Sequence, residues 1–284
     1  MTRAAILLVL LAGGSALLTA GCGTYSPLDS HYNRGVEFYD QGKLGDAIHE
    51  YQLALDDNPE NYRARYNLAV ALHDQGRKND AAAEYLKVLK LDPDNARARV
   101  SLASIRQDEG KDAEALQLLE EAAQADRYSA FPKESLGAYY ERKGDLDRAL
   151  QAYRAGAEIE PASAGSHAGI ARILSRRGAT QDAIAEYEKA LAARSSDIAT
   201  LIAASEAYEN VGDLKKAMLL LERALVHVTD RPALWIRLAR LYESQGRLED
   251  AVAALWEARG IEPSNGEVGP RLKALYEKLS AKER

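Results

Sequence analysis

The stretch QGKLGDAIHEYQLALDDNP, at residues 41–59, decides the fold, because a close variant of it returns near the other end of the chain. The second copy, QGRLEDAVAALWEARGIEP, occupies residues 245–263. The two copies start 204 residues apart, which is six times 34. Self-similarity at a fixed period of about 20 to 50 residues is typical of repeat architectures.

Cutting the chain every 34 residues from Leu28 aligns seven units up to residue 265 without an insertion. In these units position 20 is always alanine, position 8 is always small, and position 32 is proline in four units. Position 15 is always glycine, and position 24 is large and mainly apolar. The glycines are Gly42, Gly76, Gly110, Gly144, Gly178, Gly212 and Gly246, and the large residues are Tyr51, Tyr85, Leu119, Tyr153, Tyr187, Leu221 and Leu255.

These recurring positions, called columns below, have one physical explanation: each unit is a pair of antiparallel helices. Glycine at position 15 suits the left-handed backbone just past a helix end. Proline at position 32 ends the second helix, and Asp and Asn nearby, as in residues 92–95, can cap the next one. Small residues at positions 8 and 20 let the helices approach closely, while position 24 fills the space beside them. Stacking of the seven units is then expected to form one core.

This set of columns at this spacing resembles the tetratricopeptide repeat family. The resemblance implies an all-α fold, a right-handed superhelical solenoid of seven helix-turn-helix units over residues 28–265. After residue 265 the pattern stops, and residues 266–284 are predicted to form a C-terminal capping helix. Four apolar residues share one face of that helix: Leu272, Leu275, Tyr276 and Leu279. The departures from the family pattern are Arg34, at an apolar position, and Arg127, Ser195 and Thr229, in place of the proline.

The first 22 residues form a separate segment, with a basic start at Arg3 and an apolar run over residues 4–18. This run is short for a bilayer span, which needs about 20 residues, and suits the apolar region of a secretory signal. The segment ends at Cys22, the only cysteine of the chain, so no internal disulfide can form.

Ala20, Gly21 and Cys22 resemble the lipobox of bacterial lipoproteins, although Thr19 stands where that motif usually has leucine. The resemblance implies that residues 1–21 are a signal peptide, that Cys22 is lipidated with acyl chains such as palmitate, and that residues 22–27 are a short tether. Because one acyl chain binds a membrane only weakly, two or three are expected. The alternatives are an ordinary signal peptide with a chance cysteine, or an uncleaved anchor.

The sequence offers little chemistry. It contains no glycine-rich phosphate loop, metal-binding helix motif or nucleophile elbow, so neither a cofactor nor a metal site is predicted. The formal net charge of −6 gives no reason to expect nucleic-acid binding. Five histidines fall on different units and faces, and two of them occupy a position that is normally packed inside the hairpin. They are His31, His49, His73, His167 and His227.

In the resembled family, the first helix of each unit lines a concave groove through positions 2, 5, 9, 12 and 13. Transferred to this chain, these positions give an aromatic and apolar strip, an acidic row and a basic group. The candidate partner-binding residues are Tyr32, Val36, Tyr39, Tyr66, Val70 and His73 in the strip, Asp40, Asp74 and Asp108 in the row, and Arg142, Arg172 and Arg176 in the group. The alternative is that these side chains are ordinary solvated surface.

The chain is therefore predicted to be a non-enzymatic, membrane-anchored scaffold that binds proteins or peptides in the periplasm. It resembles lipoproteins that assist envelope machines, such as type IV pili or polysaccharide-export systems, and also adaptors that recruit peptidoglycan hydrolases or proteases. Gly23 after the cysteine, where there is no aspartate, resembles lipoproteins that are sent to the outer membrane rather than the inner one. An enzyme with a site in the groove and a self-assembling homo-oligomer are the alternatives from other classes.

Overall fold

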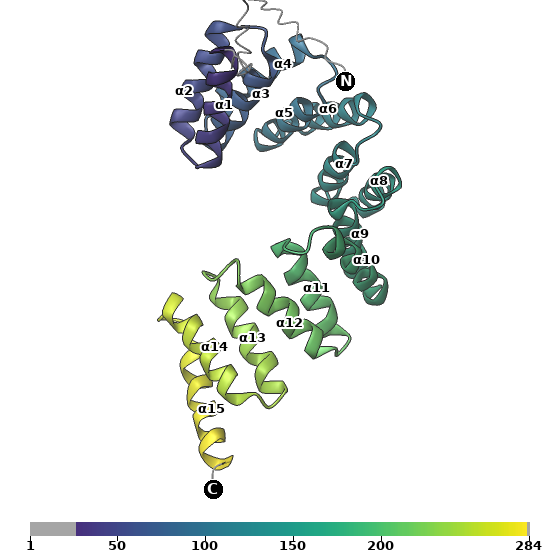
Figure 1. The fold of residues 1–284 in the computed structure, drawn as a ribbon. Coiled ribbons are helices and arrows are strands. Elements are labelled where there is room, and N and C mark those ends of the chain that lie inside the picture. The colour runs from purple at the N-terminus through teal and green to yellow at the C-terminus, as the bar shows by residue number, and fades with distance from the viewer. Residues whose placement is uncertain (1–26, 283–284) are drawn as a thin grey trace, which may run out of the picture. The chain divides into compact units, whose positions relative to one another are not determined.

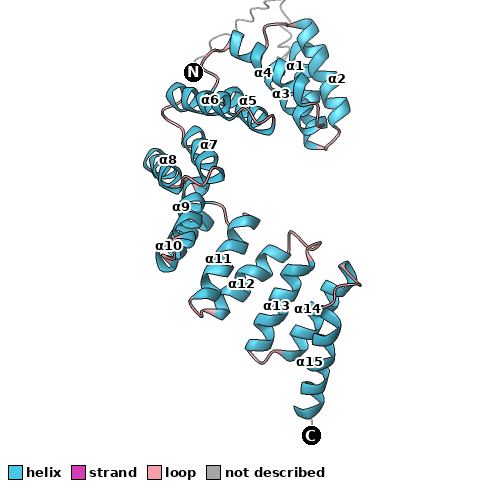
Figure 2. Cartoon of the chain, turned by 180° about the vertical axis from the view of Figure 1, so that it is seen from behind, coloured by secondary structure: helices cyan, strands magenta, loops and turns pink. Residues whose placement is uncertain are grey.

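A computed structural model describes residues 27–282, which are folded into fifteen α-helices with no strand in that range (Figures 1 and 2). The chain divides into two compact units, residues 1–84 and 85–284, and the division falls within α4. The helices of the first unit are α1 (Pro27–Asp40), α2 (Leu44–Asp57), α3 (Tyr62–Asp74) and the beginning of α4 (Lys78–Leu91).

The second unit contains the end of α4 and all later helices. These are α5 (Ala96–Asp108), α6 (Asp112–Ala125), α7 (Phe131–Arg142), α8 (Leu146–Ile159), α9 (Ala164–Arg176), α10 (Thr180–Ala193), α11 (Ile198–Asn210), α12 (Leu214–Leu225), α13 (Pro232–Ser244), α14 (Leu248–Ile261) and α15 (Val268–Lys282). The predicted all-α repeat fold is confirmed.

The glycine at position 15 forms the turn inside each hairpin, as the sequence predicts. All seven of these glycines have a positive φ, between 71° and 84°. This left-handed backbone is unfavourable for a residue with a Cβ atom, and it lets the chain reverse within a few residues. Nothing lies within 4 Å of the position that a Cβ would take at any of the seven turns. The backbone conformation alone therefore requires glycine there.

The second helices end just before the predicted prolines, and three of the helices that follow, α3, α5 and α9, begin with side-chain caps. For example, α2 ends at Asp57 before Pro59, and the side chain of Asn61 accepts a hydrogen bond from the Ala64 backbone N–H at the start of α3. Where Thr229 replaces the proline, α12 ends at Leu225 and has 12 residues, whereas α10 and α14 have 14. Helices α6 and α10 keep 14 residues although Arg127 and Ser195 replace the proline after them, so the loss of the proline does not by itself shorten the helix.

The small and large columns lie in the core. Every residue at positions 8, 20 and 24 is buried. In the first unit, a Cβ added to Gly35 would lie 2.5 Å from the Tyr51 ring, and in the second unit one added to Gly137 would lie 2.9 Å from the Tyr153 ring. Position 8 is therefore small because the ring at position 24 occupies that space.

In the second unit, each hairpin packs on the next, so the core is a series of linked clusters. Leu174 contacts both the cluster between α5 and α9 and the cluster between α9 and α13, and Trp235 links the latter to the cluster beneath α15. The first helices α5, α7, α9 and α11 also contact one another in order (Figure 1). Their outward sides therefore form one face of this unit.

Helix α15 covers the last hairpin with one apolar side. Val268, Leu272 and Leu275 are buried against α13 and α14. Tyr276, which the periodicity places on the same side, is half exposed, and its hydroxyl accepts a hydrogen bond of 3.1 Å from Trp256 Nε1. Leu279 is only partly buried as well, so the buried side is narrower than the sequence predicts.

Candidate functional site

The aromatic strip of the first unit comes from α1 and α3, which contact each other. Tyr32, Val36 and Tyr39 lie one turn apart on α1. The structure brings them together with Tyr66, Val70 and His73, which have the same spacing on α3. All six side chains are partly exposed and none is buried completely. The strip is therefore a partly buried aromatic and apolar surface, and its tyrosine side chains are not fully exposed.

A small hollow of about 80 Å³ opens within this strip. It is lined by Val36, Tyr39, Tyr51, Asn67 and Val70. The buried ring of Tyr51 lies 6.2 Å from the Tyr32 ring, centroid to centroid, and Asn67 Nδ2 donates a hydrogen bond of 3.3 Å to the Tyr32 hydroxyl. These contacts fix the rings around an apolar depression.

The acidic side chains of the first unit flank the strip. Asp40 is exposed, and Asp74 accepts a hydrogen bond of 2.5 Å from the Tyr39 hydroxyl. This hydrogen bond, together with burial and the charge of Asp74, raises the pKa of Tyr39 to about 12. Tyr39 is therefore a neutral donor at physiological pH, and it holds the Asp74 carboxylate beside the hollow. Asp108, the third acidic candidate, is exposed at the end of α5 in the second unit.

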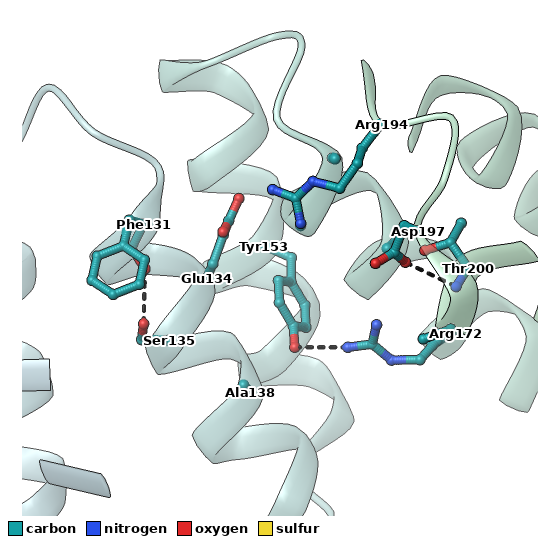
Figure 3. A pocket seen from close by; sticks show the side chains of 13 residues that line it. Phe131, Glu134, Ser135, Ala138, Tyr153, Arg172, Arg194, Asp197 and Thr200 are labelled. Atoms are coloured by element: carbon teal, nitrogen blue, oxygen red, sulfur yellow. Dashed lines mark hydrogen bonds between the residues drawn. The ribbon is translucent and has the colours of Figure 1, made fainter. Parts of the chain in front are cut away.

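Two of the three basic candidates of the second unit bind one carboxylate that sequence inspection did not single out. Arg172 donates to both oxygens of Glu141, at 3.2 and 2.8 Å, and Arg176 lies 3.2 Å from the same group. The Tyr153 hydroxyl donates to Glu141 at 3.0 Å and accepts from Arg172 at 3.1 Å (Figure 3). Arg142 is exposed, and among the described residues it forms no ion pair. Two of the three arginines are thus joined, and the third is not.

Glu141 is the centre of this network, with only 10% of its side chain exposed. Burial acts to raise the pKa of Glu141, but the hydrogen bonds and charge of Arg172, the Tyr153 hydroxyl and the charge of Arg176 outweigh it and lower that pKa. The carboxylate is therefore ionised at neutral pH and orients both guanidinium groups. Glu141 stands at position 12 of its unit, one of the groove positions, and that position alone would have identified it.

Two of the histidines, His31 and His167, each contact a glutamate of their own hairpin. His167 is buried, and its Nδ1 lies 2.5 Å from Glu186 while its Nε2 lies 2.9 Å from the Pro161 carbonyl oxygen. His31, in the same place of the first repeat, lies 2.7 Å from Glu50 and is only partly buried. The expected core role thus describes His167 better than His31. Within residues 27–282, no three His, Cys, Asp or Glu side chains converge in a way that could bind a metal ion.

The arrangement as a whole offers binding rather than covalent chemistry. The strip provides aromatic and apolar contacts, and the basic group provides directed N–H donors. The predicted lipidation site, Cys22, lies outside the described residues. None of the helices in the described range is both long and apolar enough to cross a bilayer.

Several solved structures share this fold. The crystal structure of the APC/C hetero-tetramer Cut9-Hcn1 is 18% identical with a TM-score of 0.66, covering 87% of this chain and 48% of that one. A tetratricopeptide repeat protein from Parabacteroides merdae is 18% identical with a TM-score of 0.56, covering 88% and 98%. The Pseudomonas aeruginosa pilF structure is 15% identical with a TM-score of 0.63, covering 78% and 97%. No curated relative matches the chain.

Family models give the assignment that these distant structures cannot give alone. One tetratricopeptide repeat model matches residues 32–95, 74–130 and 135–198, and a second matches residues 209–279. The matches cover most of the chain. Proteins built from such repeats are typically non-catalytic scaffolds for protein–protein interaction. The chain belongs to the tetratricopeptide repeat family.

Proposed function

We propose that the protein is a scaffold that binds protein partners through the aromatic strip, while a lipid on Cys22 anchors it to the outer membrane of a bacterial envelope. The observation that carries the binding proposal is the hollow between Val36, Tyr39, Tyr51, Asn67 and Val70. An apolar depression framed by tyrosines suits one aliphatic side chain of a partner, and tyrosine contributes strongly to protein interfaces. The anchor is supported by the lipobox-like residues before Cys22.

The cellular task that we favour is assistance in assembling an envelope machine, such as a type IV pilus or a polysaccharide-export system. Recruitment of peptidoglycan hydrolases or proteases uses the same surface and is the second candidate. Self-assembly is the third, and sedimentation at several concentrations tests it, because a monomer at every concentration argues against self-assembly. The identity of the captured partner decides between the first two.

Replacement of Tyr32 and Tyr66 by alanine together is expected to reduce partner capture at least tenfold. The pair supplies the aromatic contact on both α1 and α3, and loss of one such anchor costs about 1.4 kcal/mol or more. Capture is measured by crosslinking the full-length protein in envelope membranes and quantifying the co-purified proteins by mass spectrometry. Circular dichroism checks that the variant keeps its helices.

The matched control replaces Tyr128 and Tyr276 by alanine. These tyrosines are 93% and 49% exposed, belong to the second unit and are not part of the strip. The control should retain capture. Equal capture by the strip variant and the wild-type protein would place the binding surface elsewhere.

Cys22→Ser is expected to move the protein from the membrane fraction to the soluble fraction. The mature wild-type protein should begin at Cys22 and exceed the mass of residues 22–284 by a glyceride and acyl chains, since a cysteine thioether is the attachment point. Fractionation tests the expectation for the variant. Intact-mass measurement of wild-type protein purified from membranes tests the expected start and the added mass. A wild-type protein with a free Cys22 thiol would rule out the anchor without affecting the binding proposal.

A further inference from the structure

Helix α15 corresponds to the first helix of a repeat, but it does not turn back as the other first helices do. Counted onward from residue 266, it should turn at position 15, which is Ser280 in place of glycine. The helix instead continues through Lys282, at the end of the described stack (Figure 1). Within residues 27–282, α15 therefore has no second helix of its own, and its position 11, Tyr276, lacks the cover that such a helix gives.

Three complete repeats also have tyrosine at position 11, and in each of them a cation from the same hairpin covers the ring. The pairs, with the distance between the cation and the ring centroid, are Arg148 and Tyr140 at 4.7 Å, Lys216 and Tyr208 at 4.7 Å, and Arg247 and Tyr242 at 4.3 Å. Such a cation is attracted by the electrons of the aromatic ring. Each one belongs to the second helix or to the residue before it. These repeats therefore show what covers a tyrosine at position 11, namely a positively charged side chain from an antiparallel helix.

The hydroxyl group shows that Tyr276 occupies the usual place of this tyrosine. In the preceding repeat, the Tyr242 hydroxyl donates a hydrogen bond of 2.7 Å to Glu222, at position 25 of the repeat before it. The Tyr276 hydroxyl bonds to the residue at the same position, Trp256, whose Nε1 donates to it at 3.1 Å. Tyr276 thus has the usual contact with the preceding repeat and lacks the cation, because no positively charged group of the described residues covers its ring.

The open side of α15 carries an unused cation of its own. Tyr276 is 49% exposed, whereas Tyr208, which is covered, is 6% exposed. Lys273, one turn before Tyr276, is exposed and has no ion pair, hydrogen bond or ring contact among the described residues. Helix α15 therefore presents an uncovered ring and a free cation that do not contact each other.

We propose that α15 pairs in antiparallel fashion with α15 of a second copy, so that Lys273 of each copy covers Tyr276 of the other. The two residues are symmetric about the centre of residues 274–275, so one two-fold axis through that centre creates both contacts. The same symmetry places Gly269 opposite Ser280. These two residues are small and exposed, so the helices can approach closely.

A second copy fits this side of α15 because every group that the pair needs is present on the helix itself. Glu277 is exposed next to the ring, where it is placed to pair with the incoming Lys273. Lys216 makes the same double contact in its own repeat, with the Tyr208 ring and with Glu188 at 3.4 Å. The pair is closed, because a two-fold contact uses the same surface on both copies. It goes beyond the scaffold function proposed above and uses no residue of the aromatic strip.

Sedimentation equilibrium of the full chain at several concentrations, in a neutral detergent of matched density, should show a monomer and a dimer in exchange. Tyr276→Ala and Lys273→Ala should each weaken the dimer about tenfold, because two-fold symmetry removes two contacts at once. The controls are Tyr128→Ala and Lys215→Ala, at exposed residues outside α15, and they should leave the dimer unchanged. A monomer at every concentration, or equal effects of the test and control variants, would overturn the proposal.

Cysteine crosslinking in envelope membranes tests the orientation. A copy with Gly269→Cys should crosslink to a copy with Ser280→Cys, and neither should crosslink to a copy of its own kind. Within one helix the two positions are about 16 Å apart, at about 1.5 Å per residue, so no disulfide can form inside a chain. Gln181→Cys and Ala192→Cys, which are exposed on α10 with the same spacing, are the control pair. Crosslinking no greater than that of the control pair, or crosslinking only to a different protein, would overturn the pairing.

The pairing and the scaffold function fail independently of each other. Tyr276→Ala should lose the dimer and keep partner capture through the strip, whereas the variant with alanine at Tyr32 and Tyr66 should lose capture and keep the dimer. Loss of the dimer in both variants would place the contact between copies outside α15 and would contradict the proposal.

Discussion

Gly169→Ala is expected to destabilise the second unit by about 2 kcal/mol, although alanine is the better helix former by about 1 kcal/mol. A Cβ atom at this position would lie 2.5 Å from three atoms of the Tyr153 ring. The ring cannot retreat, because Gly137 contacts it from the neighbouring helix and its hydroxyl bonds to Glu141. The loss is measured by urea unfolding followed by circular dichroism, with hydrogen exchange of α8 and α9 as a local measure.

Gly260→Ala is the matched control, since it makes the same change in a helix at a site with nothing within 4 Å of the new Cβ. It should leave stability unchanged or raise it by about 0.5 kcal/mol. Tyr153→Leu combined with Gly169→Ala should recover part of the loss, because the smaller side chain frees the space. Equal stability of the Gly169 and Gly260 variants would show that the ring can move aside.

Glu141→Gln is expected to cost about 2 kcal/mol at neutral pH, because it leaves Arg172 and Arg176 without their shared anion. The cost stays below that of a fully buried ion pair, since both arginine side chains reach solvent. Asp147→Asn removes the partner of Arg177 at a carboxylate that is 93% exposed, so it should have no measurable effect. The two variants separate the effect of burial from the effect of charge.

The pH dependence follows from the lowered pKa of Glu141 in the folded protein. The unfolded chain binds the proton more tightly, so ionised Glu141 stabilises the fold above the ordinary glutamate pKa of 4.5. This stabilisation is lost as the pH falls through the lower, folded-state pKa. The stability difference between wild-type protein and Glu141→Gln should therefore be full at pH 7 and should shrink in acid. A difference that is independent of pH would contradict the role assigned to the charge.

The helical hairpins follow from the sequence because each one is encoded locally. Gly144 ends α7, Pro161 follows α8, and Tyr153 fills the space beside Gly137, all within 34 residues of one another. Such short-range constraints repeat seven times, so periodicity alone predicts where helices begin and end. The early end of α12 was not predicted, and the proline replaced by Thr229 does not explain it, because α6 and α10 also lack that proline and keep 14 residues.

The candidate site was predicted less well, because its features depend on contacts between repeats. The family's groove positions identified Arg172 and Arg176, but the carboxylate that binds both belongs to the preceding unit. Phe131 stands at a groove position, but the hollow that it lines between α7, α9 and α11 (Figure 3) forms only because α9 and α11 carry small residues beside it. The tyrosines of the strip were expected to be exposed, and their partial burial results from the packing of α1 on α3.

The hairpin turns and the helix contacts use glycine for two different reasons, and the difference has a chemical consequence. Gly169 has no room for the Cβ of an L-amino acid, because the Tyr153 ring occupies the space. At Gly110, by contrast, φ is 74° and the surroundings are empty. A D-amino acid, whose mirror-image preferences favour this backbone, fits there without strain. Chemical synthesis with D-alanine at such a corner would stiffen the unfolded chain and leave the folded hairpin intact.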